Sequence, residues 1–292
     1  MNENKTYIVF KKERDLGMMI TDAFKFIRDN WKGYFTSIFK IVGPVLALAL
    51  LAMIGYFFAI SDLMQDLGNN SADPMGFLKN FIPWMGILLV AYILLYTLLS
   101  MTSLFYIKSY IETNGNPSHE DVRNKVKQNF WKFFGYGFLV SIVVIFGSVL
   151  CYLPGIYLWV VLSLGTSILV FENRSVGDTF SHTFSLIKGQ WWSTFGVKIA
   201  VALLIGVLAQ AFSVPALIQF VKMATISQED PTQMFSLFKD PIYLLLNLLS
   251  YAFQFLLSSI SLIVGVFIYF DLNEQKNLTG TLERIDSIGD NY

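Results

Sequence analysis

Long runs without a charged side chain dominate the hydrophobic pattern of this chain. They cover residues 41–60, 82–107, 133–171, 199–221 and 241–270. A helix needs about 20 apolar residues to cross about 30 Å of hydrocarbon, and every run is at least that long. The run 133–171 is long enough for two spans, and we expect the turn at Pro154-Gly155, because both residues favour turns. The pattern predicts an all-α integral membrane protein with six transmembrane helices.

Composition and charge agree with this class and orient the chain. Hydrophobic residues make up 54% of the 292 residues, and charged residues only 14%, which is less than in soluble domains. With both termini in the cytoplasm, 18 of the 21 Lys and Arg residues fall in cytoplasmic segments, as the positive-inside rule requires. We expect a multi-pass protein of the cytoplasmic membrane whose first span, rather than a cleaved signal peptide, targets it.

Amphipathic segments precede some of the spans and resemble one another. The first has an apolar face at helical spacing, formed by Leu16, Ile20, Phe24, Ile27, Trp31 and Phe35. The pattern returns 160 residues later as Val176, Phe180, Phe184, Ile187, Trp191 and Phe195, and a shorter copy is Val122, Val126, Phe130 and Phe134. We predict three repeats, at about 12–111, 117–171 and 174–271, each an amphipathic interfacial helix followed by a two-span hairpin. Chance similarity is the alternative.

The repeats would form a single polytopic domain over 1–292 that ends in a cytoplasmic tail, 272–292. Apolar residues in the tail have roughly helical spacing: Leu278, Leu282, Ile285 and Ile288. We expect either a short helix that packs on the rest of the protein or a partly mobile end.

Polar and aromatic residues gather where the predicted repeats enter the membrane. Glu172 follows the fourth span, and Asp178 begins the third amphipathic helix, whose N-terminus favours negative charge. Arg174 and Asp178 would lie one turn apart if the helix continued across both. Trp side chains lie at the headgroup level of a bilayer, and basic residues beside them face anionic lipid.

These residues form a candidate lipid or partner interface. It comprises Glu172, Arg174, Asp178, Lys188, Trp191, Trp192, Arg28, Trp31 and Trp131. The alternative is that they only anchor the protein and pack its helices.

The spans offer little for catalysis or ion transport. Asp, Glu, Lys and Arg, which mark ion pathways and proton relays in membranes, are missing from the charge-free runs. The two histidines, His119 and His182, lack metal-ligand spacing, and no nucleophile or nucleotide motif occurs. No basic domain supports nucleic-acid binding. We therefore expect no catalytic, cofactor-binding or metal-binding residues and no enzyme activity.

Uncharged polar residues and prolines do occur inside the spans. Gln210, Asn247 and Gln254 can form hydrogen bonds between helices, so packing is their expected role. Pro44 and Pro215 are expected to kink the first and fifth spans, because proline removes a backbone hydrogen bond. The repeat and the kinks are compatible with a permease or channel for a neutral or amphipathic solute.

Short motifs resemble a known membrane family. They are Pro154-Gly155-Ile156-Tyr157, Glu172-Asn173, Ser185-Leu186-Ile187-Lys188-Gly189-Gln190-Trp191-Trp192, Tyr269-Phe270-Asp271-Leu272 and the start from Asp15-Leu16-Gly17 to Asn30-Trp31. They are similar to the membrane-domain family named after glycerophosphoryl diester phosphodiesterases. The resemblance implies a six-span bacterial inner-membrane protein. In that family the membrane region can precede a catalytic barrel, but the segment after Phe270 is short, so we expect neither the barrel nor its activity here.

The sequence thus favours a non-enzymatic protein of the bacterial inner membrane. We expect it to act in envelope or lipid homeostasis, or as the partner of another membrane protein. Its expected partners are membrane lipids, with another membrane protein or a second copy of this chain as alternatives. The permease or channel is the second hypothesis, and an intramembrane enzyme is the third.

Overall fold

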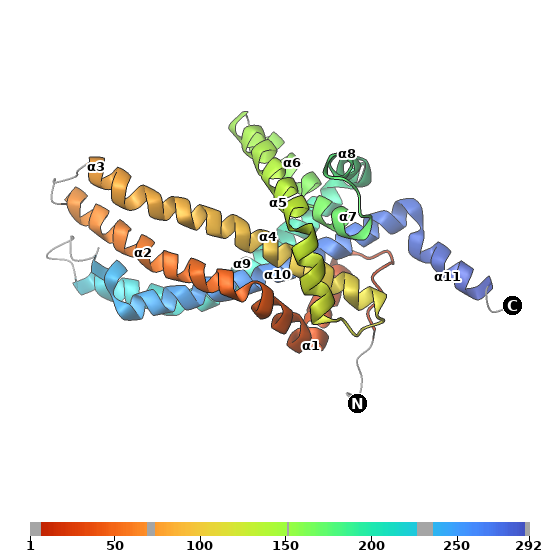
Figure 1. Ribbon diagram of the computed structural model, residues 1–292, viewed down its shortest axis with the longest axis horizontal. Coiled ribbons are helices and arrows are strands. Elements are labelled where there is room, and N and C mark those ends of the chain that lie inside the picture. The colour runs from red at the N-terminus through yellow and green to blue at the C-terminus, as the bar shows by residue number, and fades with distance from the viewer. Residues whose placement is uncertain (1–6, 69–73, 151, 227–235, 290–292) are drawn as a thin grey trace. The chain divides into compact units, whose positions relative to one another are not determined.

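The regular structure of the protein is helical. The computed structural model describes residues 7–68, 74–150, 152–226 and 236–289, and contains no β-strand in these ranges (Figure 1). The helices are α1 (Leu16–Ile41), α2 (Gly43–Gly68), α3 (Pro74–Gly76), the π-helix η1 (Phe77–Phe81), α4 (Ile82–Glu112), α5 (His119–Leu150), α6 (Tyr152–Leu162), α7 (Gly165–Phe171), α8 (Val176–Ile187), α9 (Trp191–Ile226), α10 (Pro241–Asn277) and α11 (Thr279–Gly289).

Six helical segments are long and apolar enough to cross a membrane. They are Gly43–Asp66, Leu78–Glu112, His119–Leu150, Tyr152–Phe171, Trp191–Lys222 and Pro241–Asn277. They cover the charge-free runs of the sequence except residues 41, 42 and 151, with the longest run divided between two of them. The predicted class, an all-α membrane protein with six spans, is confirmed.

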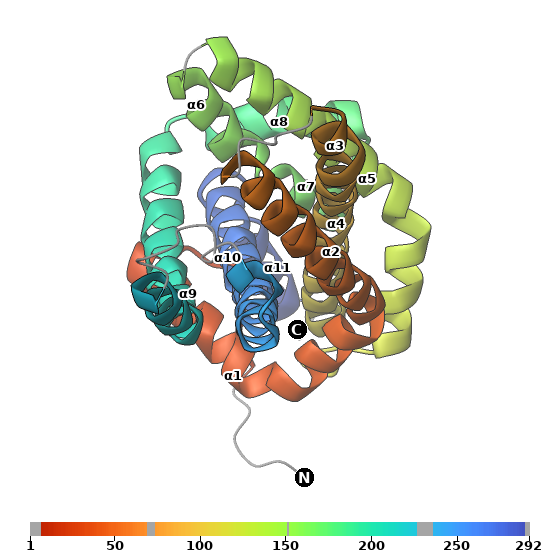
Figure 2. The same ribbon diagram turned by 90° about the vertical axis from the view of Figure 1, so that its left-hand side faces the viewer.

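The turn between the third and fourth spans was predicted in the wrong place. α5 ends at Leu150 and α6 begins at Tyr152, so Pro154 lies in the first turn of α6, where no intrahelical bond needs its N–H. Gly155 approaches α5 closely, because a Cβ there would lie 2.9 Å from the Cα of Ser148. Helices α5 and α6 accordingly lie side by side in both views (Figures 1 and 2). The fourth span is therefore Tyr152–Phe171.

Only one of the two prolines lies in the interior of a helix. Pro215 lies inside α9, as expected. Pro44 lies in the first turn of α2, directly after Gly43, and therefore interrupts no helical hydrogen bond. The predicted kink within the first span is wrong, because the chain instead starts a new helix there.

Only the first of the predicted amphipathic segments is a single separate helix, α1. The second is the beginning of the long helix α5. The third was wrongly predicted as one helix, because α8 ends at Ile187, and Trp191 and Phe195 lie in α9. In α1 the predicted aromatic face points away from the protein, with Trp31 55% exposed, while Phe26 and Tyr34 on another face are buried. α1 thus has one apolar face that is buried in the protein and a second that is half-buried at Ile20, Ile27 and Phe35 and exposed at Trp31. The threefold repeat remains a prediction.

The helices of the chain form two compact units. Unit 1 comprises Met1–Ile41, Thr97–Leu203 and Ser259–Tyr292, and unit 2 comprises Val42–Tyr96 and Leu204–Ser258.

An aromatic cluster forms the core of unit 1. Phe10 stacks on Phe267 at 4.8 Å between ring centroids, and Phe26 meets the edges of Phe10 and Tyr110 at 5.6 and 5.2 Å. Tyr34 is fully buried and shares a hydrogen bond of 2.7 Å with Ser103. Burial raises the pKa of Tyr34 to about 12, so it stays neutral at physiological pH. The cluster joins the N-terminal segment, α1, α4 and α10.

Arg14 ties the N-terminal segment to this core. Its side chain is completely buried, and its Nε donates to Asp22 Oδ2 at 2.9 Å. Its Nη1 donates to the carbonyl of Phe10 at 2.7 Å, and its guanidinium lies 4.5 Å from the centroid of the Phe267 ring. Its backbone N–H donates to Asp271 at 2.7 Å. Burial lowers the pKa of Arg14, and the nearby carboxylates oppose this shift.

The tail forms the helix α11. Glu274 caps its start by accepting bonds from the backbone N–H groups of Gly280 and Thr281 at 2.7 and 2.9 Å. The predicted apolar positions Leu278, Leu282 and Ile285 are exposed, and the side chain of Ile288 lies outside the described residues. The helix packs through Gly280 and an ion pair of Lys11 with Glu283 rather than through its apolar face.

Unit 2 contains α2 and parts of α4, α9 and α10. The Trp84 ring of α4 occupies the space beside Gly55 of α2. Ser250 of α10 donates to the carbonyl of Phe212 on α9 at 2.7 Å, and Gln254 donates to Ser213 at 3.2 Å. The expected bond between helices therefore forms at Gln254, whereas Asn247 bonds to Tyr243 of its own helix.

Candidate functional site

Glu172 is the centre of a polar cluster between α7, α8 and α10 in unit 1. It follows the last residue of α7, and its Oε1 accepts a 3.1 Å hydrogen bond from the Tyr269 hydroxyl. Its Oε2 lies 2.5 Å from Arg174 Nε and 3.3 Å from His182 Nε2. We call Glu172, Arg174, His182 and Tyr269 the Glu172 cluster. One carboxylate thus joins three segments of the chain.

Asp178 belongs to the cap of α8 and does not pair with Arg174. Ser175 is the N-cap, and its hydroxyl accepts a hydrogen bond from the Asp178 backbone N–H at 3.2 Å. The same hydroxyl donates to Asp178 Oδ2 at 2.6 Å. The predicted one-turn spacing of Arg174 and Asp178 is wrong, because the helix begins between them. Asp178 therefore orients α8 and its charge stabilises the N-terminus of that helix.

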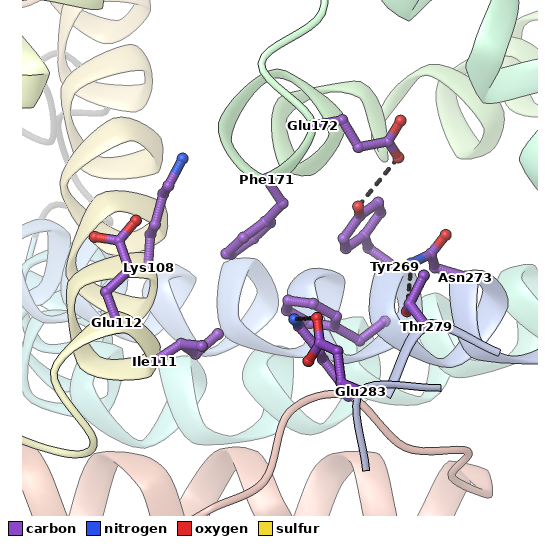
Figure 3. Close-up of a pocket in the computed structure, with 11 residues that line it drawn as sticks. Lys108, Ile111, Glu112, Phe171, Glu172, Tyr269, Asn273, Thr279 and Glu283 are labelled. Carbon is purple, nitrogen blue, oxygen red and sulfur yellow. Dashed lines mark hydrogen bonds and ion pairs between the residues drawn. The ribbon is translucent and has the colours of Figure 1, made fainter. Parts of the chain in front are cut away.

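A cavity of about 310 Å³ adjoins the cluster (Figure 3). Its lining residues are Lys11, Lys108, Ile111, Glu112, Phe171, Glu172, Tyr269, Phe270, Asn273, Thr279 and Glu283. Lys108 donates to the carbonyl of Val170 at 2.7 Å. Figure 3 shows the Glu172 carboxylate directed at the Tyr269 hydroxyl. Lys11 forms an ion pair with Glu283. Because most charges on the wall already have partners, the cavity offers little free charge to a ligand.

The remaining predicted residues are not gathered at this cavity. Arg28 pairs with its neighbour Asp29 at 3.0 Å on α1. Trp131 on α5 and Trp192 on α9 are 78% and 77% exposed. Trp31, also on α1, is exposed too, and the described residues show no contact between these side chains and Glu172. The predicted interface is therefore a dispersed set of exposed aromatics plus one compact polar cluster.

Trp191 and Lys188 lie where α8 gives way to α9. Lys188 is the C-cap of α8, and it is exposed. Trp191 stacks on Tyr157 of α6 at 5.7 Å and on Phe195 at 5.1 Å between ring centroids. Trp191 thus fixes the start of α9 against α6, whereas Trp192 beside it points outward.

Sequence reasoning missed Tyr269, His182 and Lys108 as parts of this region. Tyr269 is 97 residues from Glu172 in sequence, a separation at which no local pattern reports contact. Two signals were available: its place at the end of the last charge-free run, and its position in a motif, Tyr269-Phe270-Asp271-Leu272, that shares the family resemblance with Glu172-Asn173.

The chemistry of the Glu172 cluster favours a clamp over a catalytic base. Both oxygens of Glu172 already face donors, Oε1 one and Oε2 two, so the carboxylate is held in place by the protein itself. Within the described residues, no three His, Cys, Asp or Glu side chains are placed to hold a metal ion. The arrangement resembles a structural hub that fixes the α7–α8 corner on α10.

Replacing Glu172 by Gln is expected to lower the free energy of unfolding by about 1–2 kcal/mol, because charged hydrogen bonds to Tyr269 and Arg174 are lost. Thermal unfolding in detergent measures the effect. Glu112→Gln is the matched control, because its exposed pair with Lys125 contributes at most about 1 kcal/mol. Equal effects of the two substitutions would contradict the role of Glu172 as a hub.

The fold and cluster define an all-α membrane protein with six spans. No family model, curated protein or solved structure matches the chain. The resemblance to the membrane-domain family therefore stays a prediction, and function is argued from the residues alone.

Proposed function

We propose that this chain is a non-enzymatic protein of the bacterial cytoplasmic membrane, with both termini in the cytoplasm. It acts in envelope or lipid homeostasis, or as the partner of another membrane protein, through the cytoplasmic ends of its helices. The basic residues concentrated in these segments support the orientation. The partners that hold both oxygens of Glu172 within the protein support a role without catalysis.

The exposure of three tryptophans carries this proposal. Trp31, Trp131 and Trp192 are 55%, 78% and 77% exposed, on α1, α5 and α9. An indole ring left outside the protein core is stabilised by a headgroup layer or by a protein partner, since one end is apolar and the other polar. Exposed basic side chains accompany them, such as Lys32, whose Nζ lies 5.6 Å from the Trp31 ring centroid.

Native mass spectrometry of the protein, extracted together with its surrounding membrane, tests the proposal. We expect specific lipid or a bound protein to remain on the wild-type chain. Replacing Trp131 and Trp192 together by Ala is expected to reduce the bound fraction severalfold, because each indole contributes apolar contact area. Tyr152→Ala, an exposed aromatic at the other end of the α5–α6 hairpin, is the control. A wild-type chain that retains neither lipid nor protein, or one that hydrolyses a glycerophosphodiester, would contradict the proposal.

A second candidate, a permease for a neutral or amphipathic solute, is favoured by a hollow in unit 2. The hollow has a volume of about 480 Å³ and is lined by Gln210, Ser213, Val214, Ala216, Leu217, Phe220, Tyr243 and Asn247. It thus places uncharged hydrogen-bonding groups within the apolar spans α9 and α10, beside the proline of α9. Such groups can bind a neutral polar solute without any charge.

Solute flux into proteoliposomes tests this candidate. If the hollow binds a solute, Gln210→Leu is expected to reduce flux about tenfold. The reason is that a polar group of the solute loses the hydrogen bond to Gln210 and is left without a partner. Gln65→Leu, in α2 outside the hollow, is the control, since Gln65 bonds to Ser61 of its own helix. No flux of any neutral solute above protein-free liposomes would exclude the permease.

A further inference from the structure

One lysine of unit 1 lies at the edge of a span without a carboxylate partner. Lys198 lies on α9, just before the charge-free run that begins at Ile199. None of the ion pairs in the described part of the chain includes it. Its Nζ instead lies 5.5 Å from the centroid of the Trp159 ring on α6. The positive charge is therefore balanced only by an aromatic face.

Aromatic rings frame this lysine on both helices. Trp191 and Phe195 precede Lys198 on the same face of α9, at helical spacing, and stack on each other at 5.1 Å. Across from them, Tyr157 and Trp159 of α6 are each 44% exposed. We call Tyr157, Trp159, Trp191, Phe195 and Lys198 the Lys198 cluster. The Tyr157 and Trp159 rings are exposed, whereas Trp191 and Phe195 are half-buried.

Lys198 begins below the level of the lipid headgroups. It is seven residues beyond Trp191, about 10 Å along the helix axis. With Trp191 at the headgroup level, the lysine stem begins inside the hydrocarbon, and its ammonium must reach back towards the phosphates at the interface. An anionic headgroup would supply the counter-charge that Lys198 does not find among the described residues.

We propose that the Lys198 cluster binds the headgroup phosphate of an anionic phospholipid, with Lys198 contacting the phosphate and Trp159 contacting the acyl chain. This inference rests on the proposed function, whose lipid interface it narrows to one phospholipid class and one pair of helices. A phosphate complements the charge of Lys198, because this lysine forms no ion pair with a carboxylate of the described residues. The exposed rings select a lipid over free phosphate, since a soluble anion would leave them uncovered.

Lipid titration followed by native mass spectrometry tests the site on the full-length protein in detergent. The probes are phosphatidylglycerol, phosphatidylcholine and inorganic phosphate. We expect the wild-type protein to prefer phosphatidylglycerol, and Lys198→Gln to weaken its binding about five- to tenfold. The control is Lys222→Gln, the same substitution towards the other end of α9, which is expected to leave binding unchanged.

Two further variants separate loss of the site from loss of the fold. Lys198→Arg is expected to retain binding, because it keeps the charge, whereas Trp159→Leu is expected to weaken binding of phosphatidylglycerol by removing its aromatic contact. Equal binding by the wild-type protein and Lys198→Gln would overturn the site and leave the proposed function standing. Displacement of the lipid by millimolar inorganic phosphate would overturn the choice of a lipid. A wild-type protein that binds no lipid and no protein would contradict the proposed function as well.

Discussion

Arg14→Ala is expected to lower the free energy of unfolding by about 3–5 kcal/mol, the largest effect of any single substitution considered. The side chain of Arg14 is completely buried, and it donates to Asp22 and to the carbonyl of Phe10. Its removal leaves Asp22 without its closest cation and removes the charge that faces the Phe267 ring. Thermal unfolding in detergent measures the loss.

Lys12 supplies the matched control for this experiment. It faces the same carboxylate, at 3.8 Å from Asp22, but its side chain is 42% exposed. Lys12→Ala is therefore expected to change the free energy of unfolding by no more than about 0.5 kcal/mol. A similarly small effect of Arg14→Ala would show that the N-terminal segment does not depend on the buried guanidinium.

Gly155→Ala is expected to destabilise the α5–α6 hairpin by about 2–3 kcal/mol, because overpacking of a tight contact forces helices apart. The added Cβ would lie 2.0 Å from Ser148 Oγ and 2.9 Å from the Cα of Ser148. The side chain of Ser148 can turn away, but the backbone of α5 cannot. Reduced melting temperature in detergent is the expected readout.

Gly137 provides the opposite case on the same hairpin. Nothing lies within 4 Å of the position that its Cβ would occupy. Gly137→Ala is thus expected to stabilise α5 by about 0.5–1 kcal/mol, since alanine loses less backbone entropy in a helix. If Gly155→Ala were stabilising too, α5 and α6 would not approach as closely as described.

The spans were predictable because hydrocarbon excludes charge so strongly that the pattern needs no tertiary information. The boundary between α5, which ends at Leu150, and α6, which begins at Tyr152, was not predictable, because a proline fits the first turn of a helix as well as it fits a loop. Pro154 and Pro44 both follow that rule, and both were misread as breaks or kinks. The residues next to a proline do not show whether it begins a helix or interrupts one.

Contacts between residues far apart in the sequence limited how much of the candidate site could be predicted. Glu172 was recognisable as the first charge after a span, but Tyr269 and His182 reach it only through the packing of α8 and α10. Arg14 is similar: its burial depends on Asp271 and Phe267, more than 250 residues later in the chain. From the sequence, a charged N-terminal segment is expected to be exposed to solvent. The residues next to Arg14 do not show that aromatic rings from distant parts of the chain enclose it.

Chemical labelling of the two ends of α9 tests the central claim, that the tryptophan-bearing helix ends face the cytoplasm. Ser193→Cys and Thr225→Cys, each in a Cys151→Ser background, place a thiol near opposite ends of this helix at exposed positions. A membrane-impermeant maleimide applied to intact cells is predicted to label the cysteine at 225 and to spare the one at 193, which inverted vesicles expose. Labelling of position 193 from outside intact cells would contradict the account.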